Sequence, residues 1–227
     1  IITKQASDGS VVKEKIFEWA VRTGKKTVQA RRNGSPGPLL KVQQNLAHRL
    51  VFSKLHEKLG GNLKFAVSGG AALPKKIGLF FQAAGIKIIE GYGLTETAPV
   101  LSANPMEAPR YGTVGHVLPG ITVAIQRLDD NEIIGRQRGD EYPSDLTTEE
   151  GEIIAKGPNM MKKYWRRPEE TRAAFDPDGW YHTGDIGRFD DGYLMVTDRI
   201  KHMIVSRGGK NIYPGPIEDE FKTQRWF

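Results

Sequence analysis

The chain has 227 residues, 38% of them hydrophobic, which is enough for the core of one large domain or two small ones. Lys and Arg outnumber Asp and Glu by 33 to 27, but the basic residues are scattered and no RNA-binding, zinc-finger or zipper pattern is found. A phosphorylated small molecule or a solvated surface therefore explains the charge better than nucleic acid does. The absence of Cys excludes a disulfide framework, a thiolate-ligated metal site and a cysteine nucleophile.

No apolar run approaches the ~20 residues needed to span a bilayer. The first residues, 1–4, show neither a signal-peptide layout nor an initiator Met, so we expect a segment of a longer, cytoplasmic protein. The basic surplus leaves association with an anionic membrane surface open, although no amphipathic anchor helix is evident.

Two helices are predicted in the first quarter of the chain. Apolar residues recur at helical spacing over residues 10–23, and Gly24 follows as a C-terminal stop. A second, longer helix runs over residues 42–59 and ends at Gly60-Gly61. We expect this second helix to pack one face on a sheet.

The next section alternates between strand and helix. Residues 63–67 read as a buried strand, 74–84 as a helix with Pro in its first turn, and 86–89 as a second strand. This order predicts parallel strands joined by a right-handed crossover. Both strands end in glycine-containing turns, at the sheet edge where ligands bind in such folds.

Beyond about Gly112 the pattern changes to short strands separated by polar turns, which favours an antiparallel region. Strands are predicted at 122–126, 152–156 and 193–197, a short surface helix at 168–174, and a mobile polar segment at 127–150. The predicted fold class is α/β: a mostly parallel sheet with flanking helices, a smaller antiparallel β subregion, and the start of a small α+β C-terminal domain.

The segment from Gly91 to Thr97 contains several side chains that could bind a ligand. Its glycines allow backbone to approach a ligand, the Tyr92 ring offers a flat face for a base, and Thr95 brings a hydroxyl. Glu96 brings a hard oxygen ligand of the kind that Mg²⁺ prefers. Taken alone, however, the segment is explained as well or better by a purely structural turn with an N-capping Thr.

This segment resembles the Tyr-Gly-Leu-Thr-Glu motif of the adenylate-forming superfamily, which includes acyl-CoA synthetases, peptide-synthetase adenylation domains and beetle luciferase. Four further segments resemble the family's motifs in the family's order. They are residues 68–73, 151–158 with Tyr164, 180–187, and 198–214.

The resemblance implies a role for individual residues. Tyr92 stacks on adenine, Thr95 binds the α-phosphate, Glu96 binds Mg²⁺, and Asp185 accepts hydrogen bonds from the ribose hydroxyls. A turn-forming Asp and a surface salt bridge of Arg199 are the structural alternatives. The cofactor-binding residues implied are Gly70, Ala71, Gly91, Tyr92, Gly93, Thr95, Asp185 and Arg199.

Lys201 falls at the family's hinge between two domains. The resemblance implies a large domain that covers residues 1–198 and a small domain that covers residues 199–227. Lys201 joins Thr95 and Glu96 as an implied catalytic residue, although a solvated Lys is the commoner kind. Residues 208–210 approach the thiol donor or form a simple turn. His182 is interpreted as structural, because no nucleophile motif lies near it.

The family's reaction uses ATP, Mg²⁺ and coenzyme A: a carboxylate attacks the α-phosphorus, and a thiol then attacks the acyl-adenylate. The family's phosphate loop is expected before Ile1 and its Gly-Lys motif beyond Phe227, so the chain alone is expected to be a poor catalyst or none.

Residues 16–20, 68–71, 104–115 and 208–212 resemble long-chain fatty acyl-CoA synthetases, so a long-chain fatty acid–CoA ligase is predicted. An acyl-AMP ligase that donates to a carrier protein and a noncatalytic nucleotide-binding module remain alternatives. The sequence predicts neither the acyl chain length nor the oligomeric state.

Overall fold

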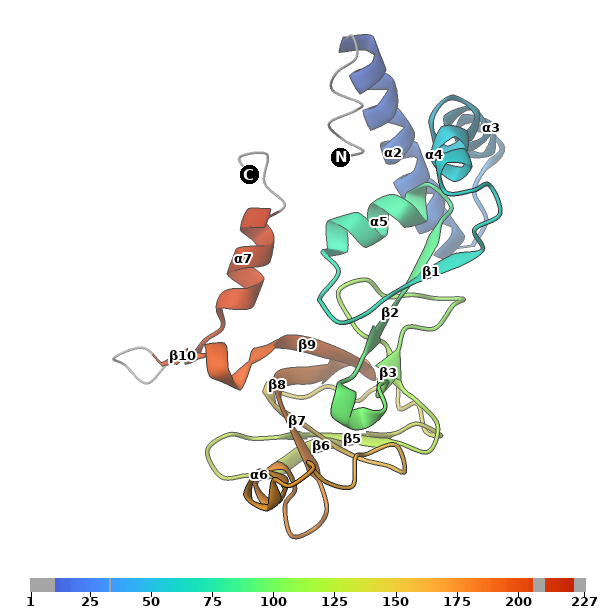
Figure 1. The fold of residues 1–227 in the computed structure, drawn as a ribbon. Helices are drawn as coiled ribbons and strands as arrows, with labels where there is room; N and C mark the ends of the chain where they lie inside the picture. The colour runs from blue at the N-terminus through green and yellow to red at the C-terminus, as the bar shows by residue number, and fades with distance from the viewer. Residues whose placement is uncertain (1–10, 33, 206–210, 223–227) are drawn as a thin grey trace. The chain divides into compact units, whose positions relative to one another are not determined.

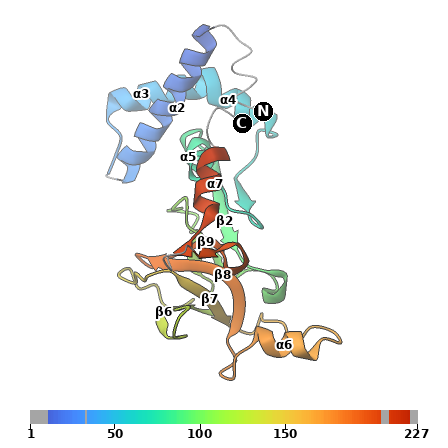
Figure 2. The same cartoon turned by 90° about the vertical axis from the view of Figure 1, so that its left-hand side faces the viewer.

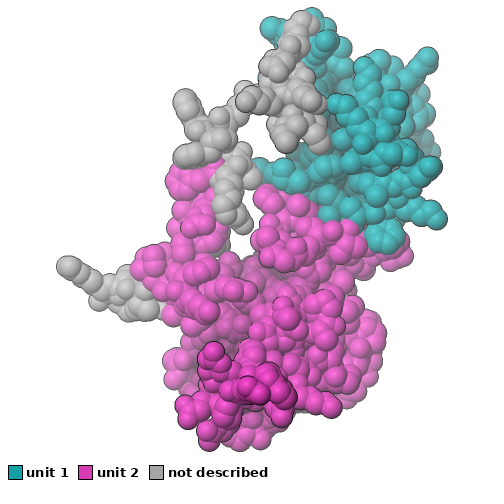
Figure 3. Space-filling model, viewed as in Figure 1, with its two compact units in different colours: residues 1–66, 75–88 teal, residues 67–74, 89–227 magenta. Residues whose placement is uncertain are grey.

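The computed structural model describes residues 11–32, 34–205 and 211–222 (Figure 1). The chain divides into two compact units, coloured separately in Figure 3. The first, the helical unit, comprises residues 1–66 and 75–88, and the second, the sheet unit, comprises residues 67–74 and 89–227.

The helical unit is built around α2, Val11–Arg32, which continues well past the stop predicted at Gly24. A Cβ at Gly24 would overlap the carbonyl oxygen of Ala83 in α5, Lys75–Ala83. The prediction of a helix end was wrong because this glycine serves close packing of α2 against α5 rather than chain reversal.

The second predicted helix is confirmed over residues 38–58, but it is not uniform. It consists of α3, Pro38–Ala47, a π-helical turn η1, His48–Phe52, and α4, Ser53–Lys58. Gly60 and Gly61 follow with φ of 87° and 75°, as expected of residues that end a helix. Its main partner is α2 rather than a sheet (Figure 2). Ala47 and Phe52 are fully buried in this unit.

The first sheet has the order β1-β2-β3-β4. The predicted strand, helix and strand are present as β1, Phe65–Ser68, then α5, then β2, Lys87–Tyr92. The predicted burial of the first strand was wrong: β1 lies at the sheet edge, and Val67 is 70% exposed. The sheet continues antiparallel through β3, Ser102–Ala103, and β4, His116–Val117.

The second sheet is larger and antiparallel, with the order β6-β5-β7-β8-β9. All three predicted strands are confirmed, and Ile125, Ile153, Phe189 and Leu194 form its fully buried core. The bounds are β5 Thr122–Gln126, β6 Ile133–Arg138, β7 Gly151–Lys156, β8 Tyr181–Asp190 and β9 Tyr193–Arg199.

Residues 127–150 were predicted to be mobile, and this was wrong because they contain β6, which pairs with β5. The side chain of Gln137 is buried, donates to the carbonyl of Gly192 and accepts from the N–H of Val117. These internal bonds fix a segment whose polarity suggested a solvated loop. The surface helix is confirmed as α6, Pro168–Ala174.

The last described part of the chain follows β9 through η3, Ile200–His202, into α7, Pro214–Lys222. An antiparallel pair, β10 Ile204–Val205 and β11 Asn211–Ile212, lies between them. Asp198 at the end of β9 accepts from the N–H of Gly215 at 2.8 Å, which ties the start of α7 to the large sheet. None of the helices that the structure describes has the length and apolarity to cross a membrane.

Replacing Gly24 with Ala should destabilise the helical unit. The new methyl group would force α2 and α5 apart, at a typical cost of about 1–3 kcal/mol for overpacking. The better helix propensity of Ala offsets only up to ~1 kcal/mol of this. Urea unfolding should show a lower midpoint for Gly24→Ala, whereas the neighbouring exposed substitution Lys25→Ala should leave it nearly unchanged. An unchanged midpoint for Gly24→Ala would show that close packing does not explain this glycine.

Candidate functional site

Asp185 on β8 is the centre of the site. Its residue is 3% exposed, and each carboxylate oxygen has a protein partner: the hydroxyl of Tyr92 donates to Oδ2 at 2.8 Å, and Nε of Arg199 lies 2.9 Å from Oδ1. Asp185 and Arg199 are direct partners across β8 and β9, so their side chains meet on one face. Three residues predicted separately from the sequence are thus brought together.

The turn that carries Asp185 is held by β7. The hydroxyl of Thr183 donates to the carbonyl of Ile153 at 2.6 Å and accepts from the N–H of Asp185. Glu152 accepts from the N–H of Gly184 at 3.1 Å, and its other oxygen lies 2.9 Å from Nδ1 of His182. Gly184 has a φ of 71°, a conformation that favours glycine. His182 therefore contacts Glu152, which agrees with the structural role predicted for it.

Opposing effects act on the charge of Asp185, and the net effect raises its pKa. Burial, the largest effect, raises the pKa of this carboxyl, while the hydrogen bond from Tyr92 and the positive charge of Arg199 lower it in part. Burial, followed by the negative charge of Asp185, raises the pKa of Tyr92 well above its ordinary value, so the phenol stays a donor. An ionised carboxylate has about four lone-pair sites, and two remain for a ligand with paired hydroxyl groups.

The Thr95–Thr97 turn, η2, is clamped by residues 159–164. The side-chain amide of Asn159 donates to the carbonyl of Thr97 at 2.6 Å, and the N–H of Met161 donates to the carbonyl of Glu96 at 2.7 Å. The hydroxyl of Tyr164 donates to Oε1 of Glu96 at 2.9 Å. Thr95 is exposed at this turn and Glu96 is half-buried.

Tyr181 joins the two halves of the site. It hydrogen-bonds to Tyr164, and its pKa is raised mainly by burial and further by the negative charges of Glu96 and Asp185. No role was predicted from the sequence for Tyr181, Asn159 or Thr97. Tyr181 lies beside the Thr-Gly-Asp turn, and Asn159 follows directly after Gly157-Pro158, so their places beside recognised motifs were the available signal.

The loop after β1, residues 69–73, is called the glycine loop, and it lies against the backbone of Gly91. A Cβ on Gly69 would sit 3.5 Å from the Gly91 carbonyl oxygen, and Gly70 has a φ of 79°. The carboxylate of Glu90 accepts from the N–H groups of Leu73 and Gly112, so it fastens this loop to the end of β2. This role of Glu90 was not predicted from the sequence.

Gly93 is required where it stands, because a Cβ there would overlap the carbonyl oxygen of Pro99. Ala71 is exposed in the glycine loop. The two glycine turns approach each other at Gly69 and Gly91.

Glu96 is suited to a magnesium ion that takes its other ligands from phosphates and water. The part of the chain that the structure describes holds no group of three or more His, Cys, Asp or Glu able to bind a metal by itself. Lys201 is exposed in η3, directly after β9. Gly208, Gly209 and Lys210 lie outside the described residues.

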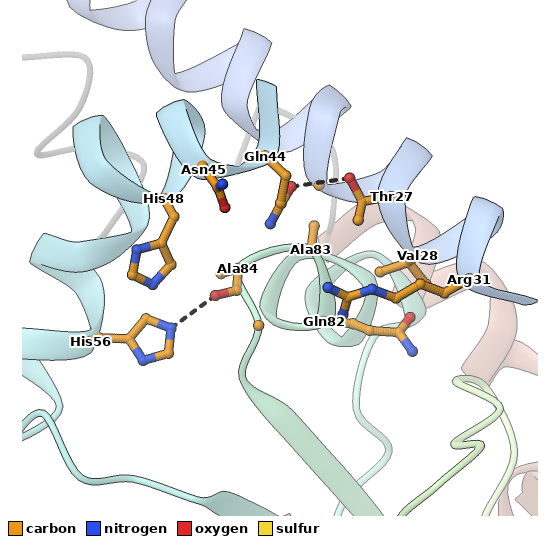
Figure 4. A pocket seen from close by; sticks show the side chains of 12 residues that line it. Thr27, Val28, Arg31, Gln44, Asn45, His48, His56, Gln82, Ala83 and Ala84 are labelled. Atoms are coloured by element: carbon orange, nitrogen blue, oxygen red, sulfur yellow. Dashed lines mark hydrogen bonds between the residues drawn. The ribbon is translucent and has the colours of Figure 1, made fainter. Parts of the chain in front are cut away.

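The helical unit contains a polar cavity of about 260 Å³ (Figure 4). It lies between α2, the α3–α4 run and α5, and its lining includes Arg31, Gln44, His48, His56 and Gln82. None of the motif residues lines it. Its polar lining is unlike the apolar surface that a long acyl chain requires.

Residues 18–165 match the family model described as AMP-binding enzyme. The long-chain-fatty-acid–CoA ligase FadD15 of Mycobacterium bovis is 36% identical over 222 residues, which cover 97% of this chain and 33% of the relative. ATP-bound MatB from Rhodopseudomonas palustris is similar in structure, with a TM-score of 0.64 and 30% identity over 79% of this chain and 34% of that one.

O-succinylbenzoate coenzyme A synthetase from Bacillus subtilis, in complex with ATP and magnesium ion, gives a TM-score of 0.61 at 29% identity. That match covers 75% of this chain and 35% of the solved chain. The present chain thus spans about a third of the length of the relatives it matches.

Glu90 should make stability fall as pH rises through the weakly acidic range. Burial raises its pKa from 4.5 to about 7, so between these values the unfolded chain loses a proton that the folded chain keeps. The loss of stability across this window is on the order of 3 kcal/mol. Glu90→Gln, which keeps an accepting oxygen, should flatten the dependence of the urea midpoint on pH between about 5 and 7. The exposed substitution Glu107→Gln should leave the slope unchanged; equal slopes for all three proteins would refute the assignment.

Proposed function

Because the chain belongs to the AMP-binding enzyme family, we propose that it is part of an ATP-dependent ligase that activates a long-chain fatty acid and transfers it to coenzyme A. The arrangement of Tyr92, Asp185 and Arg199 carries the proposal. A buried carboxylate that keeps free lone pairs beside an aromatic ring is suited to a nucleoside, since it offers acceptors for a vicinal diol and a surface for a base.

In this proposal adenine lies between the glycine loop, at Gly70 and Ala71, and the Gly91-Tyr92-Gly93 turn. The proximity of Gly69 to the Gly91 carbonyl supports a shared wall for the base. Asp185 accepts from the ribose hydroxyls, and Arg199 holds that carboxylate in place while its cationic group neutralises nearby phosphate charge.

Thr95 and Glu96 act on the phosphates. The exposed Thr95 hydroxyl donates to the α-phosphate, and Glu96 holds Mg²⁺, with Tyr164 fixing the orientation of its carboxylate. The substrate carboxylate attacks the α-phosphorus, the bond to pyrophosphate breaks, and the acyl-adenylate remains. Because attacker and phosphates are all anionic, positioning and charge neutralisation supply most of the rate.

Transfer to the thiol is proposed to follow a rotation at Lys201, between a large domain that ends at residue 198 and a small one that begins at residue 199. Asp198 supports this boundary, because the bond that it accepts from the N–H of Gly215 spans the hinge and would break or re-form in such a rotation.

The choice of a long-chain fatty acid rests on relatives named as long-chain-fatty-acid–CoA ligases. A ligase that passes its acyl group to a carrier protein would share every motif described above. We also propose that the chain by itself has little or no catalytic activity, since it spans only part of its relatives' length.

Asp185→Asn should weaken nucleotide binding about tenfold or more, because a charged acceptor of the ribose is lost. Isothermal titration of the chain with ATP and Mg²⁺ measures this. The exposed substitution Asp178→Asn is the matched control and should bind like the unaltered chain. Equal affinity of both variants would remove Asp185 from the nucleotide site, and no heat with the unaltered chain would show that the described site does not bind nucleotide.

The reaction itself is tested by pyrophosphate release from the full-length protein with short-, medium- and long-chain fatty acids, with and without coenzyme A. Release with long-chain acids, and acyl-CoA when coenzyme A is present, is the expected result. Release without any acyl-CoA product would assign the acyl group to a carrier protein, and no release with any acid would favour a noncatalytic nucleotide-binding module.

A further inference from the structure

The backbone of Asp185 is held in place by its neighbours. Its N–H donates to the hydroxyl of Thr183 at 3.1 Å, the preceding Gly184 has a φ of 71°, and β8 pairs with β9 at this residue. The freedom that remains to the side chain is rotation about its two torsions, χ1 and χ2. The groups that bond the two carboxylate oxygens therefore decide which lone pairs are left for a ligand.

Tyr92 and Arg199 each bond a different oxygen of this carboxylate. The hydroxyl of Tyr92 donates to Oδ2 at 2.8 Å, and Nε of Arg199 lies 2.9 Å from Oδ1. A carboxylate held through both oxygens loses a charge-assisted hydrogen bond if it turns about χ2. Since each carboxylate oxygen has about two lone-pair sites, one site on each oxygen stays free.

Of these two partners, Tyr92 restrains the carboxylate more strongly. The side chain of Arg199 is 53% exposed, and exposed ion pairs contribute little because water competes for both charges. Tyr92 packs against the apolar core of the large sheet, and its carbonyl accepts from the N–H of Leu101 at 2.7 Å. Burial, followed by the charge of Asp185, raises the pKa of Tyr92, so its hydroxyl keeps the proton that it donates.

One free lone-pair site on each oxygen matches two hydroxyl donors on adjacent carbon atoms, as in a ribose. A sugar that lacks either hydroxyl leaves one oxygen of the carboxylate short of a donor. Asp185 is 3% exposed, so water replaces the missing hydroxyl poorly. An acceptor left unpaired in a buried site costs more than the lost hydrogen bond itself, which is how such sites reject analogues that lack a hydroxyl.

We propose that the hydroxyl of Tyr92 makes this site select ribonucleotides over deoxyribonucleotides, because it holds the Asp185 carboxylate in the one plane where each oxygen is offered to one ribose hydroxyl. The inference rests on the proposed function and gives Tyr92 a second task beside the stacking of its ring on the base. Without the Tyr92 hydroxyl the carboxylate turns about χ2. The oxygen that a deoxyribose leaves unpaired then turns toward water or Arg199, so the missing sugar hydroxyl costs less.

The test is isothermal titration of the full-length protein with AMP, 2′-deoxy-AMP and 3′-deoxy-AMP, without Mg²⁺ or coenzyme A. The unaltered protein should bind AMP about tenfold or more tightly than either deoxynucleotide. Tyr92→Phe keeps the ring and removes the hydroxyl; it should weaken AMP binding and bring the three affinities within about threefold of one another. The matched control Tyr193→Phe removes a hydroxyl 3.5 Å from the carbonyl of Ala108, and its three affinities should equal those of the unaltered protein.

A double-mutant cycle shows whether Tyr92 acts through Asp185. Asp185→Asn alone should reduce the preference for AMP, and Tyr92→Phe added to it should change the ratio of the affinities no further. A further loss of preference in the double variant would mean that the Tyr92 hydroxyl contacts the sugar by another route, which would overturn the inference.

A Tyr92→Phe variant that binds all three nucleotides more weakly by one common factor would also overturn it, since the hydroxyl would then support the fold without selecting the sugar. The proposed function would survive that result, because the unaltered protein would still bind AMP. Absence of AMP binding to the unaltered full-length protein would overturn both. A ratio of affinities within one variant does not depend on how much of that variant is folded, so partial unfolding does not imitate the expected result.

Discussion

The burial of one carboxylate, that of Asp185, governs the arrangement of the sheet unit. A carboxylate removed from water must be compensated by hydrogen bonds or opposite charge, and Asp185 receives both, from Tyr92 and Arg199. These partners come from the first sheet and from the neighbouring strand of the second. The two sheets therefore meet at a point fixed by electrostatics as well as by the apolar core around Ile125 and Phe189.

A second set of contacts holds Glu96 and the glycine loop in place. Tyr164 orients Glu96, and Tyr181 in turn hydrogen-bonds to Tyr164. The negative charges of Glu96 and Asp185 both raise the pKa of Tyr181. Glu90 extends the same pattern to the glycine loop through the N–H of Leu73. Glu96 and the glycine loop, both proposed to touch the ligand, are thus positioned by side chains that do not, and such support keeps catalytic geometry within tolerance.

The motifs predicted residues that the structure brings together at Asp185, because Tyr92, Asp185 and Arg199 carry their chemistry in residue type and order. The nucleotide and magnesium roles of these residues and of Glu96 stay predictions. The supporting residues were not predicted, since nothing in the sequence around Glu90, Asn159 or Tyr181 says which distant group each will contact. In the fold, strand periodicity located β5, β7 and β9, but polarity hid β6 and Gly24 suggested a helix end. Both errors have the same cause, because tertiary contacts determine the structure where the local sequence pattern does not. Gln137 holds β6 through its bond to Gly192, and Ala83 packs against Gly24.

The titration of the Asp185 carboxyl carbon, followed by ¹³C NMR and assigned with Asp185→Asn, tests the central claim most directly. The account predicts that Tyr92→Phe raises the pKa of this carboxyl, because a stabilising hydrogen bond is lost, and that AMP shifts its resonance when added to the unaltered chain. A resonance that neither the Tyr92 substitution nor AMP perturbs would contradict the account, since Asp185 would then be neither held by Tyr92 nor part of a nucleotide site.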